Sequence, residues 1–208
     1  MTRLFLALMT AASAVSVQAQ STAAAVVIQP SVDTPKQRQE LRSFMTCVAK
    51  SRPTWAREML AKPYLSEAQT EAASDALSGR DRCLMKPEAE MTFRTSSIVS
   101  IVAEHSMHAA LTDANIDPLS KALNTLTPLN ASEDFALCVA SRDPVAAREL
   151  SLSEPGGAAE TLAAGKLAVH IQPCVIKGEQ PTVDLQSLRG LMSIALYRAV
   201  TTARLASN

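Results

Sequence analysis

Apolar residues recur along most of this chain at the spacing of the buried face of an amphipathic helix. Leu41, Phe44, Met45 and Val48, for example, follow the i, i+3, i+4, i+7 order, which matches the period of an α-helix. Runs that alternate apolar and polar residues, which are typical of half-buried strands, do not occur in the sequence. The pattern therefore predicts an all-α fold.

Start and stop signals divide this pattern into separate helices. Thr34 and Gln37 have the spacing of a capping box, and Pro53 ends the first helix and opens a second. Asn130 and Asp184 are further N-cap candidates, because their short side chains can accept backbone N–H groups. The expected helices span residues 34–52, 53–60, 66–77, 92–111, 144–152 and 158–170, and two more begin at 130 and 184.

One order of residues occurs twice in the chain. Phe44-Met-Thr-Cys47-Val-Ala is repeated 91 positions later as Phe135-Ala-Leu-Cys138-Val-Ala, and the second cysteine of each copy keeps the same spacing. A fixed period of this kind indicates a repeated supersecondary unit. We predict two tandem homologous helical units of about four helices each, packed as one α-helical domain or as two closely joined ones.

These patterns divide the chain into five segments. Unit 1 covers residues 34–112 and unit 2 covers residues 130–208. The linker, residues 113–129, carries a weak apolar pattern, so we expect a short bridging helix there. Residues 20–33 have no clear period and are expected to be flexible, and residues 1–19 have the composition of a signal peptide.

The signal peptide is predicted from three features of the first residues. Arg3 supplies a positive charge, an uncharged run rich in Leu and Ala follows, and Val17-Gln18-Ala19 places small residues where a signal peptidase cuts. The apolar run is too short to remain as a membrane anchor, which needs about 20 apolar residues. We expect cleavage after Ala19 and a periplasmic or secreted protein with no stable membrane span.

The four cysteines of an exported protein are expected to form two disulfides. Three connectivities are possible, and the repeat selects one, because a unit that once existed alone must have paired its own two cysteines. We predict the bonds Cys47–Cys83 and Cys138–Cys174, each of which contributes about 3–4 kcal/mol in the chain-entropy model. No CxxC pair occurs, which excludes zinc-ribbon, thioredoxin-type and c-type haem sites.

Charge and composition narrow the range of partners. Removing 19 of the 208 residues leaves 189, with 19 Lys and Arg against 20 Asp and Glu, and no long basic run. Such a chain is not expected to bind nucleic acid. Aromatic residues make up 3% of the sequence, which argues mildly against stacking sites for sugars or single-stranded nucleic acid. The core is expected to consist of Ala, Leu, Val, Ile and Met.

Glu104, His105 and His108 form the most suggestive cluster for chemistry. Two histidines three positions apart on a helix could share a metal ion. The zincin motif, however, needs histidines four positions apart, and unit 2 has no histidines at the matching place. We therefore favour partly exposed polar residues here and keep the metal site as the alternative. No cofactor and no catalytic residue is expected.

Charged residues recur at equal places in the two units: Arg57-Glu58 with Arg148-Glu149 at a spacing of 91, and Arg94 with Arg189 at a spacing of 95. A functional interpretation would make these arginines a paired anion or partner site. We favour a structural interpretation, in which they join the short second helix of each unit to its last helix through ion pairs or hydrogen bonds.

The sequence favours a non-enzymatic binding or interaction module for an unknown protein or small-molecule partner. The alternative is a small exported metal-binding protein or hydrolase that uses Glu104, His105 and His108. An exposed apolar groove that spans both units would favour the first hypothesis. Convergence of the three side chains in a pocket with a fourth polar group would favour the second.

Overall fold

The computed structural model describes Ile28 and residues 33–78, 83, 94–113, 116–175 and 183–206. These residues form nine α-helices and one 3₁₀ helix, and no strand lies among them. The elements are α1 (Pro35–Ser51), α2 (Pro53–Leu60), α3 (Glu67–Ser78), α4 (Thr95–Asp113), α5 (Ile116–Thr125), α6 (Ala131–Arg142), α7 (Pro144–Leu152), α8 (Ala158–Ile171), η1 (Gln172–Cys174) and α9 (Leu185–Ala206). The predicted all-α fold is confirmed, with four α-helices before α5 and four after it. The predicted signal peptide, residues 1–19, lies outside the described residues.

The predicted N-caps are present where short polar side chains precede a helix. Thr34 and Gln37 form both hydrogen bonds of a capping box at the start of α1. Asn130 accepts the backbone N–H of Glu133 at the start of α6, and Asp184 accepts that of Ser187 at the start of α9. These caps satisfy N–H groups that the first turn of a helix leaves without a partner.

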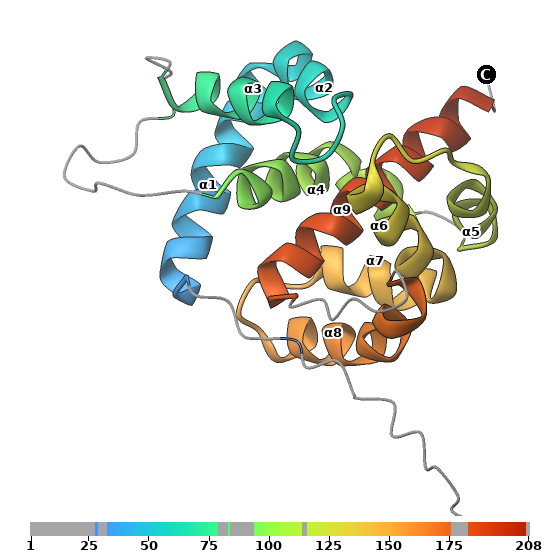
Figure 1. Cartoon of the computed structure of the whole chain (residues 1–208). Coiled ribbons are helices and arrows are strands. Elements are labelled where there is room, and N and C mark those ends of the chain that lie inside the picture. Colours follow the sequence, from blue (N-terminus) through green and yellow to red (C-terminus); the bar gives the residue numbers. More distant parts are fainter. Residues whose placement is uncertain are drawn as a thin grey trace, which may run out of the picture.

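Helices α4 and α9 cross the centre of the molecule side by side (Figure 1), and their mutual contact is the most extensive in the fold. Helices α1, α2 and α3 pack against α4, whereas α5, α6, α7 and α8 pack against α9. The last helix of each predicted unit therefore joins that unit to the other one.

Both predicted disulfides are confirmed. Cys47 in α1 is bonded to Cys83, and Cys138 in α6 is bonded to Cys174 in η1, so each half of the chain contains one bridge. Each bond joins the first helix of its half to the segment that follows the third helix. Two disulfides fit a protein that works in an oxidising compartment.

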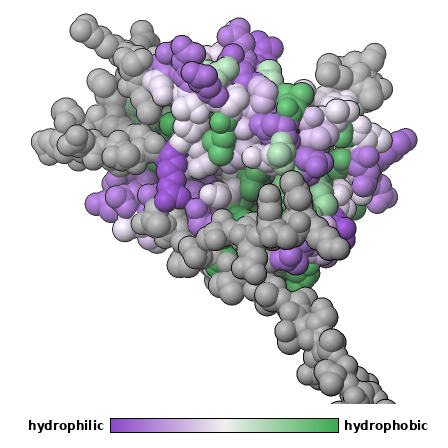
Figure 2. All heavy atoms as spheres, viewed as in Figure 1, coloured by the Kyte–Doolittle hydropathy of each residue, from purple (hydrophilic) through white to green (hydrophobic). Residues whose placement is uncertain are grey.

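One cluster of buried apolar side chains includes residues from both halves, from Leu41 in α1 to Val200 in α9. Its largest fully buried members are aliphatic or methionine side chains, as the shortage of aromatic residues predicts. Hydrophobic residues also reach the surface, where Figure 2 shows them as separate spots between hydrophilic ones. None of the described helices has the length and apolar character needed to cross a membrane.

Candidate functional site

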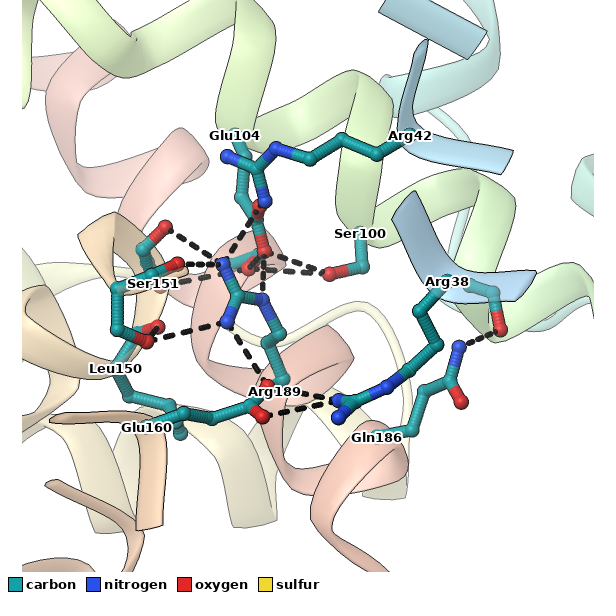
Figure 3. Close-up of polar contacts among 12 residues, drawn as sticks. Arg38, Arg42, Ser100, Glu104, Leu150, Ser151, Glu160, Gln186 and Arg189 are labelled. Carbon is teal, nitrogen blue, oxygen red and sulfur yellow. Dashed lines mark hydrogen bonds and ion pairs between the residues drawn. The ribbon is translucent and has the colours of Figure 1, made fainter. Parts of the chain in front are cut away.

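Five charged side chains of alternating sign form a continuous chain of ion pairs among α1, α4, α8 and α9 (Figure 3). The order is Arg42, Glu104, Arg189, Glu160 and Arg38, and we call this set the buried ion-pair chain. Arg42 Nη1 lies 2.8 Å from Glu104 Oε2, and Arg189 Nε lies 2.6 Å from Glu104 Oε1. Arg189 Nη1 and Arg38 Nη1 each lie 3.0 Å from a carboxylate oxygen of Glu160.

Four of these five side chains are buried, and Arg42 is partly exposed. Charges in the interior persist only when they are paired and hydrogen-bonded. The chain meets this requirement by drawing on four helices, because its members come from α1, α4, α8 and α9. It therefore links the first and second halves of the protein through polar contacts inside the shared core.

Arg189 is the central member of the ion-pair chain. Its guanidinium donates to the carboxylates of Glu104 and Glu160, to both oxygens of Ser153 and to the carbonyl oxygen of Ser151. Burial alone would lower the pKa of Arg189, but the two carboxylates outweigh burial and raise it above its ordinary value. The contacts with Ser151 and Ser153 join the end of α7 to α9.

A third buried carboxylate, Glu133, holds the two halves together elsewhere. Its oxygens accept the backbone N–H groups of Tyr64 and Leu129 at 2.8 and 3.0 Å, and a 3.0 Å bond from Arg198 Nη2. Asn130 also donates to the carbonyl oxygen of Tyr64 at 2.8 Å. The loop between α2 and α3 is thereby fixed to the start of α6.

Three helices share an inward-facing polar residue at the third position. Gln69 in α3, Glu133 in α6 and Glu160 in α8 are almost fully buried, and each accepts the N–H of the residue that lies four positions earlier. In an ordinary capping box this side chain would instead accept the N–H of the N-cap residue, three positions earlier. Ser66 and Gln69 have the spacing of such a box, and Ser66 does cap α3 by accepting the N–H of Gln69. The side chain of Gln69 bonds instead to Leu65 and to two carbonyl oxygens.

The structure does not bring together the side chains of the alternative metal site, Glu104, His105 and His108. Glu104 is bonded to Arg42, Arg189, Ser100 and Ser193 inside the protein, whereas His108 is exposed. No group of three potential metal-ligating side chains occurs within the described part of the chain. His105 is half-buried, and its pKa is lowered by burial, with smaller effects from Lys50 and His108.

The recurring charged residues occupy different environments in the two halves. Arg57 and Glu58 are exposed on α2, and Glu149 forms an exposed 2.6 Å ion pair with Lys166 of α8. Arg148 is half-buried on α7. The side chains of Arg57 and Glu58 therefore face solvent.

Arg94 and Arg189 do not lie at equivalent places. Arg94 precedes α4 and pairs with Asp184 at 3.1 Å near the surface, whereas Arg189 lies one turn inside α9 and is buried. The spacing of 95 matched these two arginines, but α4 and α9 begin only 90 positions apart. A spacing of 95 in place of 91 would require four more residues before the last helix of the second half, and the starts of α4 and α9 do not show them.

A surface groove lies between α7 and α8. Its volume is about 600 Å³, and its apolar lining comes from Val145, Leu152, Ala159 and Leu162. Leu162 and Val145 are 64% and 48% exposed, which is unusual for large aliphatic side chains of a closed core. The ion-paired residues Glu149 of α7 and Lys166 of α8 also line the groove. The groove lies within the second half, whereas the sequence suggested one that spans both units.

The buried ion-pair chain and the groove offer different chemistry. The carboxylates of the chain are saturated with hydrogen bonds from arginine and serine, so they are poorly placed to transfer protons to a substrate. The groove is lined by apolar side chains together with a few charged ones, which is the usual construction of a binding site. No protein-family model, curated protein sequence or solved structure matches the chain.

Proposed function

We propose that this protein is an exported, non-catalytic interaction module that holds an amphipathic helix of a partner protein in the groove between α7 and α8. The observation that carries the proposal is the exposed apolar lining of this groove. A volume of about 600 Å³ lies within the usual range for binding sites, about 300–1,000 Å³. Export is supported by the two disulfides and by the predicted signal peptide, which would be removed after Ala19.

The shape of the apolar surface supports an elongated partner. Leu162 and Val169 on α8 are 64% and 70% exposed and lie seven positions apart, so they share one face of the helix. Two turns of helix extend for about 10 Å, and Val145 of α7 adds a third exposed aliphatic side chain beside the groove. Amphipathic helices bind such surfaces through apolar residues spaced three, four and seven positions apart.

Site-specific photo-crosslinking tests this proposal in the native cell envelope. A photoreactive amino acid is placed at Val145 or Leu162, and Leu129 serves as the matched control because it is 49% exposed, against 48% for Val145. We expect positions 145 and 162 to capture one partner segment whose apolar residues have helical spacing. Equal capture at position 129, or captured segments without that spacing, would contradict the proposal.

Binding of the captured segment provides the quantitative test. A synthetic peptide of that segment should bind the oxidised mature protein, and Leu162→Asp should weaken binding at least about tenfold, because a charge would enter an apolar contact. Leu129→Asp should leave the dissociation constant unchanged. Amino-terminal sequencing of the exported protein should begin at Gln20, and a different start would remove the proposed cleavage site.

We also propose that the two halves arose by duplication. The starts of α2 and α7, at Pro53 and Pro144, lie 91 positions apart, as do those of α3 and α8, at Glu67 and Ala158. The disulfides have this spacing too. An experimental structure in which residues 53–78 superpose on residues 144–169 would support a common origin, and a different helix order in the two segments would oppose it.

A further inference from the structure

The outer face of α8 continues the apolar surface of the groove. Leu162 and Val169 are 64% and 70% exposed, and they lie two turns apart on one face of this helix. Gly165 and Lys166, which lie between them, are also exposed. Helix α8 lies below α7 at the lower edge of the molecule (Figure 1). The chain therefore carries a groove for an amphipathic helix and also a helix with the apolar spacing that such a groove binds.

Gly165 leaves room for a second helix on this face. A glycine inside a helix is destabilising relative to alanine, yet a Cβ at this position would meet no atom of the described residues within 4 Å. Packing within the described part of the chain therefore does not require glycine here. A residue without a side chain lets another backbone approach closely, and this one lies between the two exposed aliphatic side chains, Leu162 and Val169.

The charges that line the groove allow the surface to complement itself. Glu149 of α7 and Lys166 of α8 lie 2.6 Å apart, and their side chains are 46% and 43% exposed. Two copies related by a two-fold axis present the same surface to each other, so each acidic group needs a basic group beside it. The pair meets this condition, because a half-turn brings the lysine of one copy to the glutamate of the other. The chain as a whole has a formal net charge of zero, so long-range repulsion does not oppose such a contact.

We propose that the helix held in the groove is α8 of a second copy of this chain, so that two copies form a symmetric dimer. This inference rests on the proposed function, because it names the occupant of the same groove. The two α8 helices run antiparallel, and a two-fold axis beside Gly165 and Lys166 places Leu162 of one copy opposite Val169 of the other. The two pairs of Glu149 and Lys166 then lie beside the axis as four charges of alternating sign.

Sedimentation velocity of the oxidised mature protein tests the dimer. The apolar contact is small, and small interfaces are weak and transient, so the protein is measured from about 1 to about 500 µM. We expect a reversible shift from monomer to dimer within this range. A monomer at every concentration would overturn the proposal.

Substitutions on α8 assign the dimer to this helix. Val169→Asp should raise the dissociation constant of the dimer at least about tenfold, because it places a charge in the apolar contact. Leu129→Asp is the matched control, since Leu129 is 49% exposed and does not line the groove. Gly165→Gln should also weaken the dimer, but it should not lower the melting temperature of the dilute monomer, because glutamine favours the helix and its Cβ meets no described atom within 4 Å. Unchanged dimerisation in Val169→Asp, or equal weakening in Leu129→Asp, would overturn the proposal.

Exchange of the two charges tests the two-fold arrangement. Glu149→Lys places four lysines beside the axis and Lys166→Glu places four glutamates there, so each variant alone should dimerise more weakly than the unmodified protein. In an equal mixture the lysines of one variant face the glutamates of the other, and we expect a heterodimer. Labelling one variant with ¹⁵N lets native mass spectrometry distinguish the heterodimer from both homodimers. A mixture that dimerises no more tightly than either variant alone would overturn the proposal.

Photo-crosslinking from position 145 separates this inference from the proposed function. A crosslink to α8 in a product of twice the chain mass would support both. Capture of a helical segment of another protein, by a chain that stays monomeric, would overturn the dimer and leave the proposed function standing. Capture of no helical segment at all would overturn both.

Discussion

Leu65 and Gly156 lie 91 positions apart and adopt the same unusual backbone conformation. Their φ angles are 55° and 82°, and they are the residues with positive φ in the described part of the chain. Each donates its N–H at 2.7 Å to a buried side chain four positions later, Gln69 or Glu160. The same left-handed turn thus precedes α3 and α8, with a leucine in one case and a glycine in the other.

This relationship predicts opposite effects of substitution at the two positions. Leu65→Gly should raise the free energy of unfolding by up to about 1 kcal/mol, because relief of the left-handed conformation outweighs the added flexibility of the unfolded chain. Little packing would be lost, since Leu65 is 44% exposed. Gly156→Ala should lower the free energy of unfolding by about 1–2 kcal/mol, because alanine is strained in the left-handed conformation. The added Cβ would also lie only 3.0 Å from Pro35 Cβ.

Urea unfolding of the two variants and of the unmodified protein measures both changes. Gly165→Ala is a suitable control, because a Cβ at this exposed position in α8 meets no atom within 4 Å. Alanine should stabilise that helix by about 1 kcal/mol. A loss of stability in Leu65→Gly would show that the left-handed turn costs little in this protein.

Local signals in the sequence were sufficient to predict the helices and their caps. Thr34, Asn130 and Asp184 were identified because a cap depends on residues within one turn of each other. The disulfides were predictable because the repeated spacing left one reasonable pairing. Leu65 was missed because leucine carries no signal for positive φ.

The buried polar contacts could not be predicted in the same way. Glu133 and Glu160 have the local sequence of ordinary capping residues, and only the packed fold gives them a second partner from a distant helix. Arg189 resembled Arg94 in sequence, yet one is buried and the other exposed. Spacing along the chain does not encode which face of α9 meets α8.

Arg189→Met should destabilise the protein strongly. The substitution removes the central cation of the buried ion-pair chain and leaves two buried carboxylates with one arginine each. Removing one partner of a buried ion pair costs about 3–5 kcal/mol, because the other charge is left buried and unpaired. Chemical unfolding of the oxidised protein, monitored by circular dichroism, should show this loss.

Arg94→Met is the matched control for that experiment. Its ion pair with Asp184 is partly exposed, so its removal should cost no more than about 1 kcal/mol. Similar losses for the two variants would mean that the ion-pair chain contributes no more than a surface pair.

His105 should make the protein less stable as the pH falls below about 6.5. Its pKa is lowered in the folded state, chiefly by burial, so the unfolded chain binds a proton more readily than the folded one. The stabilising contribution is present above the ordinary pKa of histidine and is lost as the pH falls toward the lowered value. The melting temperature of His105→Gln should therefore fall less between pH 7.5 and 5.5.

The same substitution at His170 is the control for this pH effect. His170 is half-buried on α8, and His170→Gln should leave the effect of His105 in place. An identical pH dependence in His105→Gln and the unmodified protein would show that another group is responsible.

Tyr64 and Gly190 should be energetically coupled. The Tyr64 hydroxyl is buried without a hydrogen-bond partner among the described residues, and a Cβ at position 190 would lie 2.5 Å from it. Gly190→Ala should therefore cost about 1–3 kcal/mol through overpacking, whereas Tyr64→Phe should be neutral or stabilising because it removes an unsatisfied polar group. In the double variant, removal of the Tyr64 hydroxyl gives the alanine methyl group at position 190 more room, and alanine has a higher helix propensity than glycine. The carbonyl oxygen of Ser96 would still lie 3.3 Å from that methyl group. A double-mutant cycle should show that Tyr64→Phe recovers about 1 kcal/mol or more of the loss; additive effects would mean that α9 shifts to accommodate the methyl group.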